Sequence, residues 1–154
     1  GRESKAMRLT SPAFEDGGEI PRRHGYRNDN LSPTLEFGEV PQEAVSLALV
    51  VDDPDAMEPA GKVWDHWVVW NIDPDTRKVP EGSVPQGGTE GTTDYGETGY
   101  GGPNPPDREH TYRFRLYALD KELDLPSSAC KADLEKAING HVLGRADLSG
   151  RYAP

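Results

Sequence analysis

Short apolar segments separated by glycine and proline are the feature that most constrains how this chain folds. Its 154 residues include 17 glycines and 14 prolines. Residues 46–53, 63–72 and 110–120 lie between these breaks, are rich in aliphatic and aromatic side chains, and have the length of strands. Because Gly and Pro interrupt regular structure and mark turns, the pattern predicts a mainly β protein with long connections.

A single helix is expected near the C-terminus. Residues 127–140 read SSACKADLEKAING, in which Ser127 or Ser128 is the candidate N-cap and the final Asn-Gly marks the end. Cys130 begins an apolar stripe with helical spacing, at positions 130, 134, 137 and 138. We therefore interpret Cys130 as a small core residue of a peripheral helix. Alternation in residues 145–152 predicts a closing strand.

The chain is acidic, with a formal net charge of −10 from 17 basic and 27 acidic residues. No group of Lys or Arg is larger than a pair, which argues against binding to nucleic acid or to an anionic membrane surface. The sequence shows no basic-then-apolar leader and no apolar run that approaches the length of a membrane span. A lone cysteine excludes an intrachain disulfide and favours a reducing, cytoplasmic compartment.

We interpret residues 1–6, GRESKA, as a cloning remnant or a disordered tail, and residues 7–154 as a single domain. No fixed-period repeat and no shift in composition marks a second domain. Two connections are long, residues 10–44 and 80–109, and the second holds eight glycines and five prolines. A structureless stretch of that length in a compact domain is usually either functional or disordered.

Each predicted strand carries a titratable residue near one end of its apolar face. Side chains alternate between the two faces of a strand, which assigns neighbours to each such residue. The expected neighbours are residues 47, 49 and 51 for Asp53, residues 64, 68, 70 and 72 for His66, and residues 114, 116 and 118 for His110 and Tyr112. The face opposite Tyr112 carries arginines, so we expect it to lie nearer the solvent.

These titratable groups converge if their strands are neighbours. If the first two strands pair antiparallel, Asp53 and His66 lie at the same edge of the sheet, and His110 and Tyr112 join them if their strand runs beside that of His66. With Asp55, they would line a small mouth with an aromatic floor, which is typical of a small-molecule site. Taken singly, His66 also fits a satisfied core histidine, the Asp-Pro-Asp segment a turn, and the GGPNPP segment a structural loop.

Three motifs together resemble the phosphatidylethanolamine-binding protein family. They are D-P-D-A at residues 53–56, a histidine within the aromatic strand WDHWVVWNI, and G-P-x-P-P followed by H-x-Y over residues 102–112. The resemblance covers about residues 8–152 and is closest to the compact bacterial and archaeal branch, often labelled Raf kinase inhibitor-like. It implies a large antiparallel sheet packed on a smaller one, as in a β-sandwich, with one peripheral helix. It also implies a pocket for phosphate-type groups, including the phosphoethanolamine head group.

Carried over residue by residue, the family's ligand-binding positions correspond to Asp53, Asp55, His66, Gly102, Pro103, Pro106, His110 and Tyr112. Three positions depart from the common pattern. Met57 stands where Pro is frequent, Arg108 where Gly is frequent, and Thr111 where Arg is frequent. The change at position 111 removes a cation near the mouth, which Arg108 can supply from a neighbouring position. We therefore expect the ligand preference to differ from that of common family members.

The residues favour binding of a small molecule that bears a phosphate or a carboxylate. The two histidines, the Tyr112 hydroxyl and loop N–H groups can donate hydrogen bonds to an anion. Asp53 can fix a histidine tautomer and raise its pKa, and Asp55 suits an ammonium group on a zwitterionic ligand. The resemblance also implies an alternative, a protein-interaction module that inhibits a kinase or a serine protease, and it allows a homodimer.

We expect no enzymatic activity, although His, Asp and Tyr can carry out acid–base chemistry. The sequence lacks a G-x-S-x-G nucleophile elbow and an H-E-x-x-H zinc helix. A metal-dependent hydrolase built on His66, His110 and a carboxylate has suitable ligand types, but neither histidine has a second ligand at a characteristic spacing. We therefore expect no metal, no cofactor, no nucleic acid and no membrane insertion.

Overall fold

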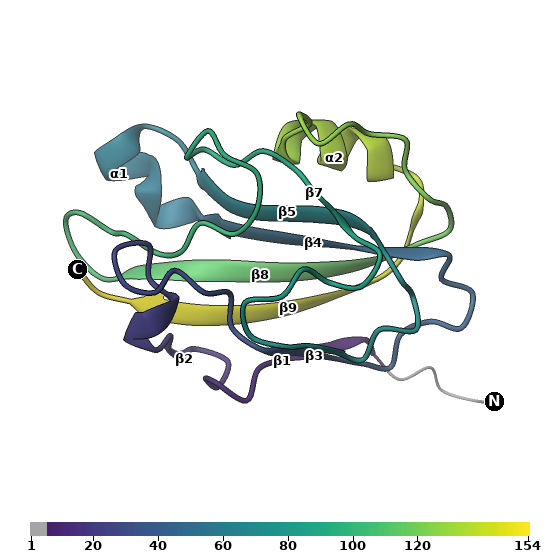
Figure 1. Ribbon diagram of the computed structural model, residues 1–154, viewed down its shortest axis with the longest axis horizontal. Helices are drawn as coiled ribbons and strands as arrows, with labels where there is room; N and C mark the ends of the chain where they lie inside the picture. The colour runs from purple at the N-terminus through teal and green to yellow at the C-terminus, as the bar shows by residue number, and fades with distance from the viewer. Residues whose placement is uncertain (1–5) are drawn as a thin grey trace.

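The computed structural model describes residues 6–154, so the interpretation of residues 1–6 falls almost entirely outside it. The described chain forms two sheets (Figure 1). The smaller sheet has the order β1-β3-β6, with strands Arg8–Thr10, Leu35–Gly38 and Lys78–Val79. The larger sheet has the order β2-β9-β8-β4-β5-β7, with strands Gly18–Glu19, Val142–Tyr152, His110–Leu119, Ser46–Asp53, Trp64–Ile72 and Thr89–Glu90. All pairings in the larger sheet are antiparallel except that of β2 with β9.

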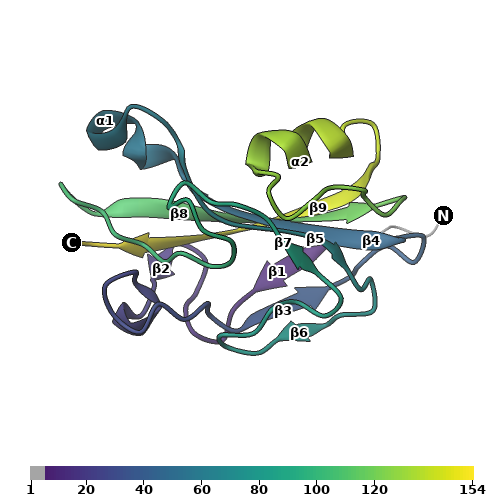
Figure 2. The same cartoon turned by 45° about the horizontal axis from the view of Figure 1, so that its top comes forward.

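The two sheets form a sandwich, and the α-helices lie on the outer side of the larger sheet (Figure 2). One core lies between the sheets and includes Phe37 and Phe114. A second core lies between the larger sheet and helix α2, Lys131–Ile138, and includes Trp70 and Leu134. The predicted mainly β fold, with a large sheet packed on a smaller one, is confirmed.

Strand β4 is buried along its whole length because it lies in the middle of the larger sheet. Leu49 and Val51 pack into the core between the sheets, whereas Ala48 and Val50 pack beneath α2. The unbroken apolar run of residues 46–53 predicted a strand covered on both faces, and this is confirmed. The C-terminal end of β4 is therefore held by neighbouring strands on both sides.

Strand β5 departs from simple alternation at two β-bulges. Val51 pairs with Trp67 while the next residue, Asp52, pairs with Asp65, so His66 is an extra residue in β5. A second shift in register falls near Asn71, whose φ of 56° lies in the left-handed region. A bulge bends the strand and redirects the side chains that follow it.

The bulges correct the predicted neighbours of His66. Trp67 and Val69 belong to the core between the sheets, whereas Val68 and Trp70 face α2. The prediction that His66 shares a face with Val68 and Trp70 was therefore wrong, because an inserted residue shifts the alternation of side chains by one. The second bulge shifts it again, which returns Ile72 to the core between the sheets.

The helices differ from the prediction in two ways. Helix α2 begins after Cys130, whose backbone N–H donates to Asp133 Oδ2 at 3.0 Å, so neither Ser127 nor Ser128 is the N-cap. Cys130 is half-buried at this cap, and Ala129 takes the buried position instead, which makes the core assignment of Cys130 wrong.

Two short helical elements that follow β4 were not predicted from the sequence. These are the 3-10 helix η2, Pro54–Ala56, and helix α1, Met57–Ala60. A further 3-10 turn, η1, spans Arg22–His24. Among residues 6–154, none of the helices has the length and apolar character needed to cross a bilayer.

Candidate functional site

A cavity of about 240 Å³ opens where β4 ends and β5 and β8 begin. Five of the predicted site residues line it: Asp53, His66, Pro106, His110 and Tyr112. Its other lining residues come from β5, from the two short helices and from the loop before β8: Ala56, Pro59, Ala60, Trp64, Tyr95, Asn104 and Pro105. The predicted convergence of three strand ends at one mouth is therefore present in the structure.

The arrangement of the strands differs from the predicted one. β4 and β5 are antiparallel neighbours as expected, so Asp53 and His66 meet at one edge. β8 pairs with β4 and not with β5, so Asp53 lies on the strand between His66 and His110. This central place lets the Asp53 carboxylate reach the first residue of β8 directly.

His110 is held between two carboxylates. Its Nδ1 lies 2.5 Å from Asp53 Oδ2, and its Nε2 lies 2.7 Å from Asp107 Oδ1. A carboxylate only accepts hydrogen bonds, so both ring nitrogens must donate, which requires the imidazolium form. Burial by itself disfavours this cation, but the hydrogen bonds and charges of Asp53 and then Asp107 raise the pKa of His110 above its ordinary value.

Asp107 is the contact of His110 that the sequence reasoning missed. It lies in the loop before β8, its side chain is 35% exposed, and it approaches His110 from three residues earlier in the chain. Asp53, by contrast, is buried at the end of β4. The only signal in the sequence was an acidic residue placed close before a histidine in a loop already expected to be functional.

His66 has the opposite protonation state. Its Nδ1 lies 2.7 Å from the carbonyl oxygen of Gly101, and a carbonyl only accepts, so Nδ1 carries the proton. Burial lowers the pKa of His66, which keeps the ring neutral. The rings of Tyr95 and Tyr112 pack edge-on against it, with centroids 5.6 Å and 5.1 Å away. The two histidines of the pocket therefore differ in charge because their partners differ.

Among the described residues that line the cavity, Tyr112 has the one hydroxyl that is buried without a hydrogen-bond partner. The residue is 1% exposed, and its oxygen makes no hydrogen bond to any of the described residues. Burial, followed by the charge of Asp53, raises the pKa of this phenol, so the hydroxyl stays protonated. Leaving a buried polar group unpaired costs about 1–3 kcal/mol, which makes its position at a cavity wall significant.

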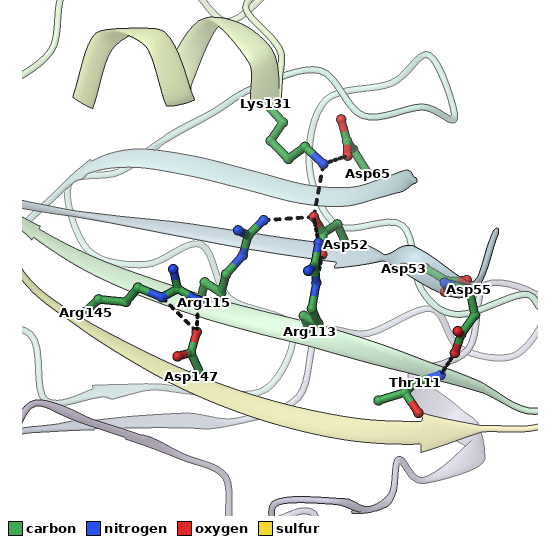
Figure 3. Close-up of polar contacts among 10 residues, drawn as sticks. All are labelled: Asp52, Asp53, Asp55, Asp65, Thr111, Arg113, Arg115, Lys131, Arg145 and Asp147. Atoms are coloured by element: carbon green, nitrogen blue, oxygen red, sulfur yellow. Dashed lines mark hydrogen bonds and ion pairs between the residues drawn. The ribbon is translucent and has the colours of Figure 1, made fainter. Parts of the chain in front are cut away.

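Three of the predicted ligand-binding residues lie behind the cavity wall. Asp55 accepts a hydrogen bond from the backbone N–H of Thr111 at 2.8 Å, which ties η2 to the start of β8 (Figure 3). Gly102 donates its N–H to Asn30 Oδ1 at 2.7 Å. The carbonyl of Pro103 accepts from the backbone N–H of Tyr26 at 2.9 Å. These contacts position the lining residues, and none of the three residues lines the cavity itself.

Arg108 lies at the rim and is shared between two carboxylates. Its Nη2 atom lies 3.9 Å from Asp55 Oδ1 and 3.6 Å from Glu58 Oε2. The side chain is half-exposed and does not line the cavity. The expected cation near the mouth is therefore present, but it is already paired with Asp55 and Glu58.

The opposite face of the same strands carries a buried ion network. Asp52 is fully buried and receives hydrogen bonds from Arg113, Arg115 and Lys131 (Figure 3). Lys131, at the start of α2, also lies 2.7 Å from Asp65 Oδ1. Because Asp52 and Asp65 precede Asp53 and His66 directly, the network fixes the strand ends that carry the pocket. As expected, this face of β8 lies nearer the solvent, since Arg113 and Arg115 are half-buried whereas Tyr112 and Phe114 are buried, but both arginines are paired with Asp52.

A family model described as phosphatidylethanolamine-binding protein matches residues 10–153 of this chain. The chain therefore belongs to the phosphatidylethanolamine-binding protein family, and the resemblance stated from the motifs is confirmed.

The relatives cover nearly the whole chain. It is 50% identical over 151 residues to a UPF0098 protein of Methanothermobacter thermautotrophicus, covering 95% of this chain and 98% of that protein. Among solved structures, a homologue of phosphatidylethanolamine-binding protein from Chlamydia trachomatis shares 40% identity, with a TM-score of 0.91 and coverage of 97% and 98%. YbcL of Escherichia coli, a member of the same family, shares 29% identity, with a TM-score of 0.88 and coverage of 96% and 98%.

Proposed function

We propose that this protein binds a small molecule with a phosphate or carboxylate group, such as a phosphoethanolamine-like head group, in the cavity at the ends of β4, β5 and β8. The observation that carries the proposal is the convergence of His66, His110 and Tyr112 on this cavity, together with a buried Tyr112 hydroxyl that makes no hydrogen bond to the described residues. A ligand oxygen would supply the missing acceptor.

The size and lining of the cavity support a head group in preference to a larger ligand. Its volume of about 240 Å³ is below the range of roughly 300–1,000 Å³ that is usual for drug-sized ligands. Trp64 and Pro59 give apolar walls, while polar atoms converge from Asp53, His66 and Tyr112. A few convergent polar groups on apolar walls are the usual composition of a site for a small molecule.

We propose binding without turnover. His110 donates through both ring nitrogens, so it has no lone pair with which to take up a proton from a substrate. Inhibition of a kinase or serine protease, the alternative drawn from the sequence, stays a prediction. A phosphorylated side chain or an acidic peptide terminus could enter the same cavity, so the binding assay applies to both.

The test is calorimetric titration of phosphoethanolamine into the native protein and into Tyr112→Phe. We expect saturable binding to the native protein and at least a tenfold weaker affinity in the variant, because a charge-assisted hydrogen bond is lost. Tyr117→Phe is the matched control, since Tyr117 lies on the same strand and faces α2. Equal affinity in all three proteins, or binding to none of them, would reject the proposal.

A further inference from the structure

The atom that His66 presents to a ligand follows from its contacts. Nδ1–H is used by the carbonyl of Gly101, so the remaining nitrogen, Nε2, carries a lone pair in the neutral ring. Nε2 makes no hydrogen bond within residues 6–154, and His66 is part of the cavity wall. The cavity therefore offers a hydrogen-bond acceptor at this point, and a bare phosphate oxygen is an acceptor too.

The surroundings of His66 oppose a second proton on its ring. The cavity wall around His66 also includes Asp53 on β4, Tyr95 in the loop between β7 and β8, and His110 and Tyr112 on β8. Burial lowers the pKa of His66, and the hydrogen bond to Gly101 and the charge of Asp53 only partly offset this effect. Both tyrosines are neutral, since burial raises their pKa. A cationic His66 is thus costly at neutral pH.

The local charge also disfavours a dianionic ligand. His110 contributes one positive charge, while Asp53 and Asp107 contribute one negative charge each, which sums to −1. The Arg108 cation at the rim lies between Asp55 and Glu58. A doubly charged phosphate would therefore enter a site without net positive charge, whereas a singly protonated phosphate meets less repulsion.

We propose that the ligand itself supplies the proton between its phosphate and His66, so that the pocket selects phosphomonoesters over phosphodiesters. This inference rests on the proposed binding of an anion in this cavity. A phosphomonoester has a second ionisation near pH 6, so it can present a P–O–H group to Nε2 while another oxygen accepts from Tyr112. A phosphodiester has no such hydrogen, and its oxygen would face the lone pair of Nε2.

Binding of this kind changes the number of protons bound to the ligand. Above a pH of about 6, the free monoester is mostly a dianion, so forming the complex takes up close to one proton from the buffer. That proton lies between the phosphate oxygen and Nε2, and no covalent bond changes. The affinity should therefore fall by up to tenfold for each unit of pH above this range.

Methyl phosphate and dimethyl phosphate are the probes, because they are small and lack an ammonium group; at pH 6 about half of the methyl phosphate is the monoanion, and dimethyl phosphate is a monoanion throughout. Affinities are measured by calorimetry at pH 6 and pH 8, with constant chloride ionic strength. At pH 8, two buffers of different ionisation enthalpy report the number of protons taken up. The proteins are the native chain, His66→Gln, whose amide can donate to a phosphate oxygen, and Tyr112→Phe.

We expect the native protein to bind methyl phosphate at least tenfold more tightly than dimethyl phosphate at pH 6, because a site built for a donor rejects an analogue that lacks it. His66→Gln should reduce this ratio to below about threefold, since an amide can donate where the imidazole accepts. Tyr112→Phe should weaken both probes and keep the ratio.

Two results separate this inference from the proposed function. Equal affinity of the native protein for both probes, with no proton taken up at pH 8, would overturn the selectivity while leaving anion binding intact. Binding of neither probe at either pH would instead remove the proposed function itself. If His66→Gln fails to fold, the ratio of the two affinities and the proton uptake of the native protein decide the question together.

Discussion

Asp52 and Asp53 are consecutive residues at the end of β4, and their side chains serve opposite faces of the larger sheet. Asp53 Oδ2 lies 2.5 Å from His110 in the pocket, while Asp52 is buried in the ion network beneath α2. Strand geometry requires this division, because successive side chains point to opposite faces. The pocket and the ion network therefore lie on opposite faces of the same strand ends, and a substitution in one should also alter the structure of the other.

Replacing Lys131 by Met should destabilise the protein strongly. Lys131 is the residue that joins Asp52 and Asp65, and both carboxylates are buried. Removing one partner from a buried ion network costs about 3–5 kcal/mol, because charge is left uncompensated. Urea denaturation of Lys131→Met measures this directly. Lys136→Met on the same helix is the control, and a loss as small as the control's would contradict a bridging role for Lys131.

Replacing Asp107 by Asn should lower the pKa of His110 towards its ordinary value. The charge and hydrogen bond of Asp107 help to raise that pKa, second only to those of Asp53 among the raising effects. An NMR titration of the His110 ring protons measures the change in the free protein. Glu58→Gln removes a rim carboxylate that does not contact His110 and is the matched control. The interpretation fails if the two variants shift the His110 pKa equally.

The same contact predicts a pH dependence of folding stability. Because the folded-state pKa of His110 is raised, its contribution is fully present below the unfolded value of about 6.5 and is lost as pH rises through the folded value. Asp107→Asn should therefore destabilise the protein more at pH 6 than at pH 9. Thermal unfolding at the two pH values tests the sign, and a larger loss at pH 9 would show that Asp107 stabilises by another route.

Replacing Gly102 by Ala should disturb the loop that forms the pocket rim. A Cβ atom there would lie 2.0 Å from the carbonyl oxygen of His24, which belongs to the backbone and cannot rotate away as a side chain could. The loop would have to move, which would break the hydrogen bond from Gly102 to Asn30. Gly38→Ala is the control, since its Cβ would meet only the flexible end of Arg8. We expect a clear loss of stability and of phosphate affinity for Gly102→Ala alone.

Much of the fold was predictable because the strands carry their own pattern. The apolar run of β4 predicted burial on both faces, and the strand ends placed Asp53, His66 and His110 near one mouth. Alternation failed in β5, because a bulge inserts one residue without any change in composition, and His66 is that residue. The sequence signal therefore located the histidine but not its neighbours.

Other parts of the site depend on contacts that leave little trace in a sequence. Asp107 was missed because its role depends on the path of an irregular loop, and helix α1 because four residues are too few for a periodic pattern. Cys130 was assigned to the core because its spacing fits the helix, yet its backbone N–H is bonded to Asp133 at the N-terminus. Such contacts become visible only when the chain is folded.

The proposed function requires that a phosphate group bind in the cavity lined by His66, His110 and Tyr112. The most direct test is an NMR titration of the ring protons of the four histidines with phosphoethanolamine, at constant ionic strength and with chloride as the control. We expect saturable shifts at His66 and His110 with one common affinity, while His24 and His141 respond as they do to chloride. Shifts that do not saturate at His66, or that match the chloride control, would contradict it.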